Sequence, residues 1–114
     1  MTPLAWRALL LAAVASFGAL GLHAPLLVLP PGRWDLLGHG GFHALFGWIS
    51  TRAFPPNPTR RALGWALLAL LGYGAAIEVL QAFAPGRSPS WSDLLANATG
   101  LALGAAVGRG SEHR

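Results

Sequence analysis

Three pairs of polar residues stand three or four positions apart inside apolar stretches of this 114-residue sequence. The pairs are Asp35 with His39, Glu78 with Gln81, and Asp93 with Asn97. Residues at these spacings lie on one face of a helix, so each pair presents its side chains in one direction. A carboxylate beside an imidazole can act as a general acid or base, and carboxylates, imidazoles and amides together can bind a polar ligand.

Two of the pairs belong to a repeated stretch. Residues 31–39 read "PGRWDLLGH" and residues 85–97 read "PGRSPSWSDLLAN", and both copies end on the polar residue four positions after the Asp. In one interpretation the chain contains two helical hairpins related by an axis along the membrane normal. In the other, both copies are simply helix starts, because an Asp in the first turn stabilises a helix by about 0.3–1 kcal/mol.

The composition indicates an integral membrane protein. Hydrophobic residues make up 54% of the chain and charged residues only 11%, whereas a soluble domain carries about 25% charged residues. The chain has no Cys, which excludes disulfides and Cys-ligated metals. Its basic residues are all Arg and are scattered among apolar segments, so we expect no nucleic-acid partner. The length fits a single domain over residues 1–114.

Four apolar segments predict an all-α bundle of four transmembrane helices, at about residues 6–28, 35–52, 62–83 and 91–108. A spanning helix needs about 20 mostly apolar residues. The first and third segments reach that length outright, whereas the second and fourth reach about 18 residues only with their polar ends at the membrane interface. The first segment could instead be a signal peptide, but Pro25 would directly follow the cleavage site, which is a poor context.

The distribution of Arg predicts the orientation in the membrane. With four spans, the N-terminus, the second loop and the C-terminus share one side, and this side carries Arg7, Arg52, Arg60, Arg61, Arg109 and Arg114. The other side carries only Arg33 and Arg87. Because an excess of basic residues marks the cytoplasmic side, we expect a multi-pass protein of the bacterial cytoplasmic (plasma) membrane with both termini in the cytoplasm.

The last segment carries small residues at every fourth position, a pattern that favours close helix packing. These residues are Ala96, Gly100, Gly104 and Gly108. We expect a similar role in the second segment for Gly40, Gly41 and Gly47.

The depth of the polar residues predicts a single outward-facing pocket. A helix rises 1.5 Å per residue, so His39 lies about 6 Å below Asp35, and Asn97 lies at the same depth below Asp93. Glu78 approaches the same layer from the third helix. The predicted binding residues are Asp35, His39, Glu78, Gln81, Arg87, Asp93 and Asn97. Polar side chains inside a membrane usually face the bundle interior or a cavity and mark a functional site.

His43 extends the stripe of Asp35 and His39 by one further helical turn. With His39 and Glu78 it could form a metal site, since two His four residues apart are a familiar ligand spacing. A histidine in a helical bundle more often bonds a neighbouring helix, so we expect no metal and no other cofactor. If the protein is an enzyme, the candidate catalytic residues are Glu78, His39 and Asp35.

Taken together, these motifs resemble the VanZ-like family. The resemblance is carried by "DLLGH" at residues 35–39, by Gly47, and by "EVLQAFAPGRSPSWSDLLANATG" at residues 78–100. The residues that match the family pattern are Asp35, His39, Glu78, Gln81, Pro85, Arg87, Asp93, Asn97 and Gly100. The sequence departs from the pattern at two positions: Leu36 stands where the family usually has Lys, and His43 where an aromatic residue is frequent.

The resemblance implies a small bacterial membrane protein of the cell envelope, since the family takes its name from a member associated with resistance to the antibiotic teicoplanin. The expected function is binding of a lipid headgroup, a cell-wall precursor or a glycopeptide in the outward-facing pocket. Membrane lipids are the expected partners. Two alternatives remain: a membrane enzyme acting on a lipid-linked substrate, and a structural or partner protein without a ligand.

Overall fold

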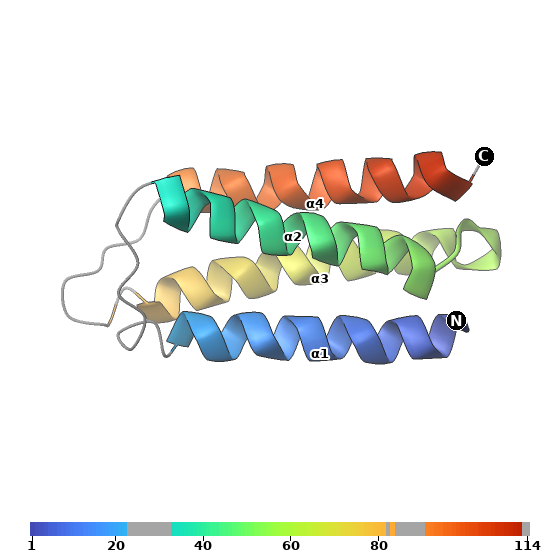
Figure 1. The fold of residues 1–114 in the computed structure, drawn as a ribbon, viewed down its shortest axis with the longest axis horizontal. Coiled ribbons are helices and arrows are strands. Elements are labelled where there is room, and N and C mark those ends of the chain that lie inside the picture. Colours follow the sequence, from blue (N-terminus) through green and yellow to red (C-terminus); the bar gives the residue numbers. More distant parts are fainter. Residues whose placement is uncertain (23–32, 82, 84–90, 113–114) are drawn as a thin grey trace.

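The computed structural model describes residues 1–22, 33–81, 83 and 91–112. These residues form four helices, which are α1 Pro3–Leu22, α2 Arg33–Ala53, α3 Pro56–Gln81 and α4 Trp91–Glu112 (Figure 1). No strand occurs in the described part of the chain. The all-α prediction is therefore confirmed.

The helix ends follow the positions of Pro. α2 ends at Ala53, and α3 begins at Pro56 rather than near residue 62, because the fixed φ of Pro suits the first turn of a helix, where the missing N–H costs no hydrogen bond. α4 continues to Glu112 rather than ending near 108, so its glycines do not interrupt it. The expected end of the first helix, near residue 28, lies outside the described residues.

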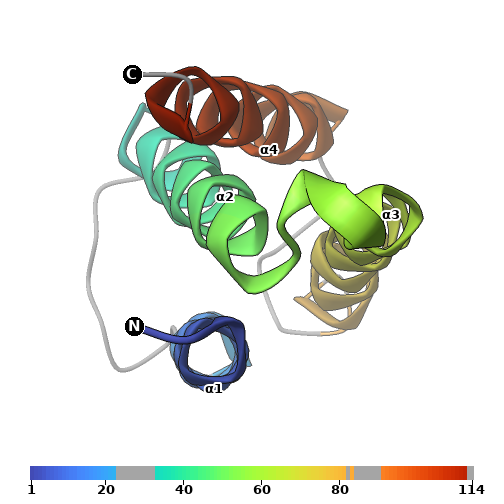
Figure 2. The ribbon, with the colours of Figure 1, turned by 90° about the vertical axis from the view of Figure 1, so that its right-hand side faces the viewer.

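Successive helices run in opposite directions, so α2 and α4 are parallel to each other (Figure 1). α1 and α4 lie on opposite sides of α2, and α3 lies beside α2 and α4 (Figures 1 and 2). The first residues of α1 and the last residues of α4 lie at the same end of the bundle (Figure 1).

Small residues allow the backbones of α2 and α4 to touch. A Cβ added at Gly100 would collide with the carbonyl oxygen of Gly40, and one added at Gly104 would collide with the backbone of Ala44. The predicted close packing of the fourth helix therefore has α2 as its partner. Gly41 differs from the expectation, because a Cβ there would meet nothing within 4 Å: it lies on a face of α2 turned away from this contact.

α1 is held to the bundle by aromatic packing and by interhelical hydrogen bonds. The Phe17 ring packs edge-on against His43 and Phe46 of α2, with ring centroids 5.2 Å and 5.7 Å apart. The Tyr73 hydroxyl of α3 donates to the carbonyl oxygen of Val14 at 2.9 Å. These contacts close the centre of the bundle around His43, which is fully buried.

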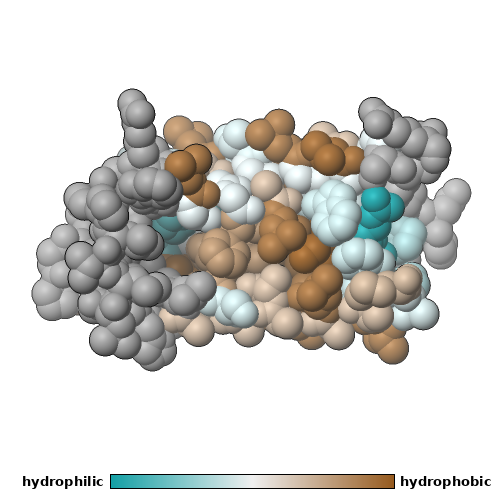
Figure 3. All heavy atoms as spheres, viewed as in Figure 1, coloured by the Kyte–Doolittle hydropathy of each residue, from teal (hydrophilic) through white to brown (hydrophobic). Residues whose placement is uncertain are grey.

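Among the described residues, one helix is long and apolar enough to cross a membrane. This stretch of α3, Arg60–Leu80, has 21 residues; an 18-residue window within it has a mean hydropathy of 1.8, and only 28% of that window is buried inside the molecule. α1 contributes a shorter apolar stretch, Pro3–Ala19. Four spanning helices are therefore not confirmed: α2 carries His39 and His43, and α4 is short of bulky apolar residues. Figure 3 shows apolar residues along the middle of one face of the bundle, with the strongest hydrophilic colour toward its ends.

Candidate functional site

Four polar side chains converge at the end of the bundle opposite the first residues of α1. We call this group the polar cluster; it consists of His39, Glu78, Asp93 and Asn97. His39 lies in the second turn of α2 and Glu78 in the last turn of α3, whereas Asp93 and Asn97 lie in the first two turns of α4. The antiparallel order of the helices brings these turns to the same end.

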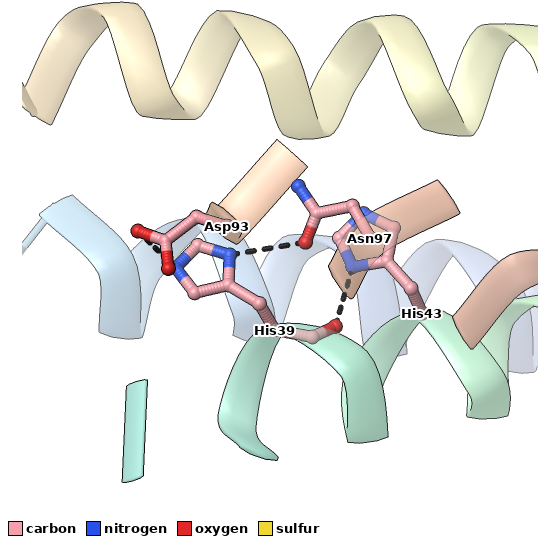
Figure 4. Close-up of polar contacts among 4 residues, drawn as sticks. All are labelled: His39, His43, Asp93 and Asn97. Carbon is pink, nitrogen blue, oxygen red and sulfur yellow. Dashed lines mark hydrogen bonds and ion pairs between the residues drawn. The ribbon is translucent and has the colours of Figure 1, made fainter. Parts of the chain in front are cut away.

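His39 and Asn97 form the centre of the cluster. The Nδ1 atom of His39 lies 3.1 Å from Oδ1 of Asn97, and both side chains are buried (Figure 4). Because an amide oxygen can only accept a hydrogen bond, Nδ1 of His39 is the donor. The other ring nitrogen, Nε2, is therefore turned toward the carboxylates. His39 and Asn97 are also the corresponding residues of the two repeated stretches, so equivalent positions of the repeat meet in the fold.

The two carboxylates face this free edge of the His39 ring. Nε2 of His39 lies 3.9 Å from Oδ2 of Asp93, which is longer than a hydrogen bond of 2.7–3.2 Å. His39, Glu78 and Asp93 each have one atom that could ligate a metal ion, and these three atoms lie within 4.8 Å of one another. Glu78 is 7% exposed. Two carboxylates and an imidazole thus share a small volume that is largely shielded from solvent.

His43 is not a member of the polar cluster but contacts one of its residues, His39. Its Nδ1 donates to the carbonyl oxygen of His39 at 2.8 Å, one turn earlier in the same helix. Its Nε2 and the Nδ2 of Asn97 have no hydrogen-bond partner among the described residues. Both atoms point to Gly74 of α3, where an added Cβ would lie 2.6 Å from the His43 atom and 2.7 Å from the Asn97 atom.

The structure brings together four of the predicted site residues. The side chains of Asp35 and Gln81 lie outside the described part of the structure, although both residues belong to helices. Arg87 lies outside the described residues altogether. The group with metal-ligand geometry contains Asp93 where the sequence suggested His43, because Nε2 of His43 points to Gly74 of α3 rather than to the carboxylates.

Two features of the site were missed from the sequence. Gly74 lets His43 and Asn97 approach α3, and the available signal was a glycine inside an apolar helix, which often marks a close approach. Phe17 packs on the rings of both His39 and His43, at 5.7 Å and 5.2 Å between centroids. No sequence pattern indicates this contact, because it depends on how α1 is turned toward α2.

An apolar groove runs beside the cluster between α3 and α4. It has a volume of about 580 Å³. Its lining residues are Leu68, Leu71, Gly72, Ala75, Trp91, Leu94, Leu95 and Ala98. Ala75 stands one turn before Glu78, and Leu94 and Ala98 directly follow Asp93 and Asn97. The same segments of α3 and α4 therefore build the groove and contribute to the polar cluster.

No curated protein and no solved structure matches the chain. The VanZ/LLP1 family pattern matches residues 8–109, which includes all of α2 and α3, most of α1 and α4, and every residue of the polar cluster. With this match over most of its length, the chain belongs to the VanZ/LLP1 family, as the motifs at residues 35–39 and 78–100 had predicted.

Proposed function

We propose that the protein is a multi-pass membrane protein of the bacterial cell envelope that binds an amphiphilic ligand. The polar cluster takes the head group of a lipid or a lipid-linked cell-wall precursor, and the groove between α3 and α4 takes its apolar chain. The observation that carries this proposal is the adjacency of the two features: a buried set of carboxylate, imidazole and amide groups beside an open apolar groove built by the same helices.

The free-energy cost of burying carboxylates in the polar cluster supports a ligand-binding role. A buried carboxylate in an apolar bundle is expensive, and such residues usually mark substrate or ion sites. A purely structural cluster could tie the helices together with hydrogen bonds worth about 0.6–2 kcal/mol each. A structural role would not require two carboxylates and an imidazole with their donor atoms within 4.8 Å of one another.

The groove favours a ligand with a hydrocarbon chain over a fully polar one such as a glycopeptide core. Burial of a methylene group contributes about 0.8 kcal/mol when the alternative is water, although less when it is lipid. Because a lipid chain gains little by moving from the membrane into the groove, the main effect of the groove would be to align the ligand so that its head group lies at the polar cluster. Trp91 is the first residue of α4 and is 82% exposed. An exposed Trp at a helix end is typical of the aromatic belt at a membrane surface.

A membrane enzyme acting on a lipid-linked substrate is the second candidate, and one observation favours it. His39 has a defined tautomer, set by Asn97, and presents Nε2 to two carboxylates. This is an arrangement suited to general acid–base catalysis. Catalysis would require Glu78 for turnover but not for binding, so Glu78→Gln would abolish product formation while leaving substrate affinity near that of the wild type.

The first prediction concerns orientation. Arg7 donates to the carbonyl oxygen of Ala53 at 3.0 Å, so Arg7 and the end of α2 lie together at the end opposite the cluster. By the distribution of basic residues this end faces the cytoplasm. Because the natural chain has no Cys, single Ser88→Cys and Asn57→Cys variants can be tested in intact cells. An impermeant thiol reagent is expected to label position 88 and not position 57; the reverse pattern would contradict the orientation.

The second prediction concerns the ligand. A photoreactive polyprenyl phosphate is expected to crosslink to residues of the groove in membranes that contain the wild-type protein. Ala98→Trp should reduce this crosslinking at least several-fold, because the indole fills the groove next to Asn97. Ala102→Trp is the matched control, since Ala102 is exposed one turn further along α4, and it should crosslink like the wild type.

Asp93→Asn completes this experiment. It is expected to reduce crosslinking while leaving the thermal unfolding midpoint in detergent close to that of the wild type. Unchanged crosslinking in both Ala98→Trp and Asp93→Asn would refute the ligand. A large fall in the midpoint of Asp93→Asn would instead assign the cluster a structural role.

A further inference from the structure

The His39 side chain has the hydrogen-bonding pattern of a metal ligand. Histidines that bind metals usually donate their other ring N–H to a protein oxygen, which fixes the tautomer and the ring orientation. In this structure Nδ1 of His39 donates to Oδ1 of Asn97 at 3.1 Å. Nε2 of His39 lies on the side of the ring toward Asp93 (Figure 4), and a ligand atom of Glu78 lies within 4.8 Å.

The spacing of the donor atoms fits a small cation. With Nδ1 used as a donor to Asn97, Nε2 is the ring atom left to bind a cation, and a cation between Nε2 and a carboxylate oxygen attracts both. The 3.9 Å between His39 Nε2 and Asp93 Oδ2 is longer than a direct hydrogen bond of 2.7–3.2 Å. Two ligand atoms about 2.1 Å from one ion lie at most about 4.2 Å apart. Three ligands around one tetrahedral ion lie about 3.4 Å apart, so the set, within 4.8 Å, closes on the ion as it binds.

We infer that the polar cluster binds one divalent transition-metal ion through His39 Nε2 and one carboxylate oxygen from each of Glu78 and Asp93. Imidazole and carboxylate ligands together suit Zn²⁺ and Mn²⁺. Three protein ligands leave a coordination position open, which is the arrangement in sites where the metal meets a substrate. The ion therefore has a free position on the side of a bound head group.

This inference deepens the proposed function and rests on it for the identity of the head group. The carboxylates of Glu78 and Asp93 are not themselves ligands for a phosphate. A divalent ion held by both carboxylates offers a cation at its open position, where a phosphate oxygen can bind. The class of ligand that follows is a phosphate-bearing lipid rather than a zwitterionic or neutral one.

The test uses the full chain in detergent, stripped of metal by a chelator and titrated with Co²⁺. The wild type is expected to bind one Co²⁺ per chain, seen as a visible absorption band that Zn²⁺ removes by competition. Asp93→Asn and Glu78→Gln should each weaken the affinity more than tenfold. Glu112→Gln is the matched control, because it makes the same acid-to-amide change at the opposite end of α4, and it should bind like the wild type.

Thermal unfolding provides a readout that does not depend on the absorption band. Zn²⁺ is expected to raise the unfolding midpoint of the wild type and of Glu112→Gln but not of Asp93→Asn, since a ligand stabilises only a state that binds it. A wild type that shows neither the band nor the shift at micromolar metal would overturn the metal site. Binding that Asp93→Asn and Glu78→Gln both retain would overturn it equally.

The two proposals fail separately. If the photoreactive polyprenyl phosphate crosslinks but the wild type shows neither the Co²⁺ band nor the Zn²⁺ shift, the lipid-binding function stands and the metal inference falls. If the metal binds with one-to-one stoichiometry but the lipid does not crosslink, the metal site stands and the proposed function falls. If both hold, crosslinking should increase with Zn²⁺ and lose that dependence in Asp93→Asn.

Discussion

A leucine in place of Gly104 is expected to separate α4 from α2 and to unfold the bundle in detergent. A Cβ at this position would overlap the carbonyl oxygen of Ala44 and lie 2.7 Å and 2.9 Å from its carbonyl carbon and Cα. These are backbone atoms in the middle of a helix, so no side chain can rotate away. Overpacking a core commonly costs about 1–3 kcal/mol when side chains can yield. We therefore expect a loss of more than about 3 kcal/mol, measured by chemical denaturation followed by circular dichroism.

Gly41→Leu is the matched control for this change, because it inserts the same side chain into α2 where nothing lies within 4 Å. The corresponding alanine variants sharpen the comparison. Gly41→Ala is expected to leave stability unchanged or raise it by up to about 1 kcal/mol, as Ala is the better helix former. Gly104→Ala should lower it. Equal effects at the two positions would mean that α2 and α4 do not pack through Gly104.

The sequence predicted that α4 packs closely but could not name its partner. The four-residue spacing of Gly100, Gly104 and Gly108 is a local property of one helix. The choice of α2 depends on how the helices are arranged around one another, which no local spacing encodes. The inclusion of Gly41 among the packing residues was wrong for the same reason: composition marks a glycine, whereas only the rotation of α2 decides which glycine faces α4.

The four helices themselves could be predicted because apolar stretches and Pro-rich breaks alternate along the chain. Which of these helices cross a membrane is harder to predict from each segment by itself. Only the stretch Arg60–Leu80 satisfies length and hydropathy on its own. α2 and α4 bury their polar residues against each other, so their suitability for a membrane depends on the assembled bundle rather than on either sequence alone.

Helical rise was sufficient to predict that His39, Glu78, Asp93 and Asn97 lie at similar depth. It was not sufficient to predict which of them touch. The bond between His39 and Asn97 depends on the close approach of α2 and α4, which their small residues allow. The replacement of His43 by Asp93 in the candidate metal set depends on the direction of the His43 ring, whose Nε2 points to Gly74 of α3. Both depend on how the helices are rotated about their axes, which the spacing of residues in the sequence does not determine.

Gly74→Ala is expected to disable the polar cluster without replacing any of its four residues. The new methyl group would lie 2.6 Å from Nε2 of His43 and 2.7 Å from Nδ2 of Asn97. His43 cannot retreat, because its Nδ1 is bound to the carbonyl oxygen of His39 and its ring is packed against Phe17. Asn97 must therefore move, and its oxygen then leaves Nδ1 of His39.

The expected result follows from what that bond does. Loss of the acceptor leaves a buried N–H unsatisfied, which costs about 1–3 kcal/mol, and it frees the His39 ring to turn away from Glu78 and Asp93. Removing the group that orients a metal-binding histidine typically weakens metal affinity 10–100-fold. Gly74→Ala should therefore lose at least tenfold in Co²⁺ affinity and show a lower unfolding midpoint.

Gly64→Ala is the matched control, because it makes the same change in α3 at a position with nothing within 4 Å. Both variants gain the same helix propensity, so any difference between them reports the contact at Gly74 alone. If the two variants bind Co²⁺ with equal affinity and unfold at the same midpoint, His43 and Asn97 do not press against α3 at this point. The orientation of His39, and with it the metal site, would then lose its structural basis.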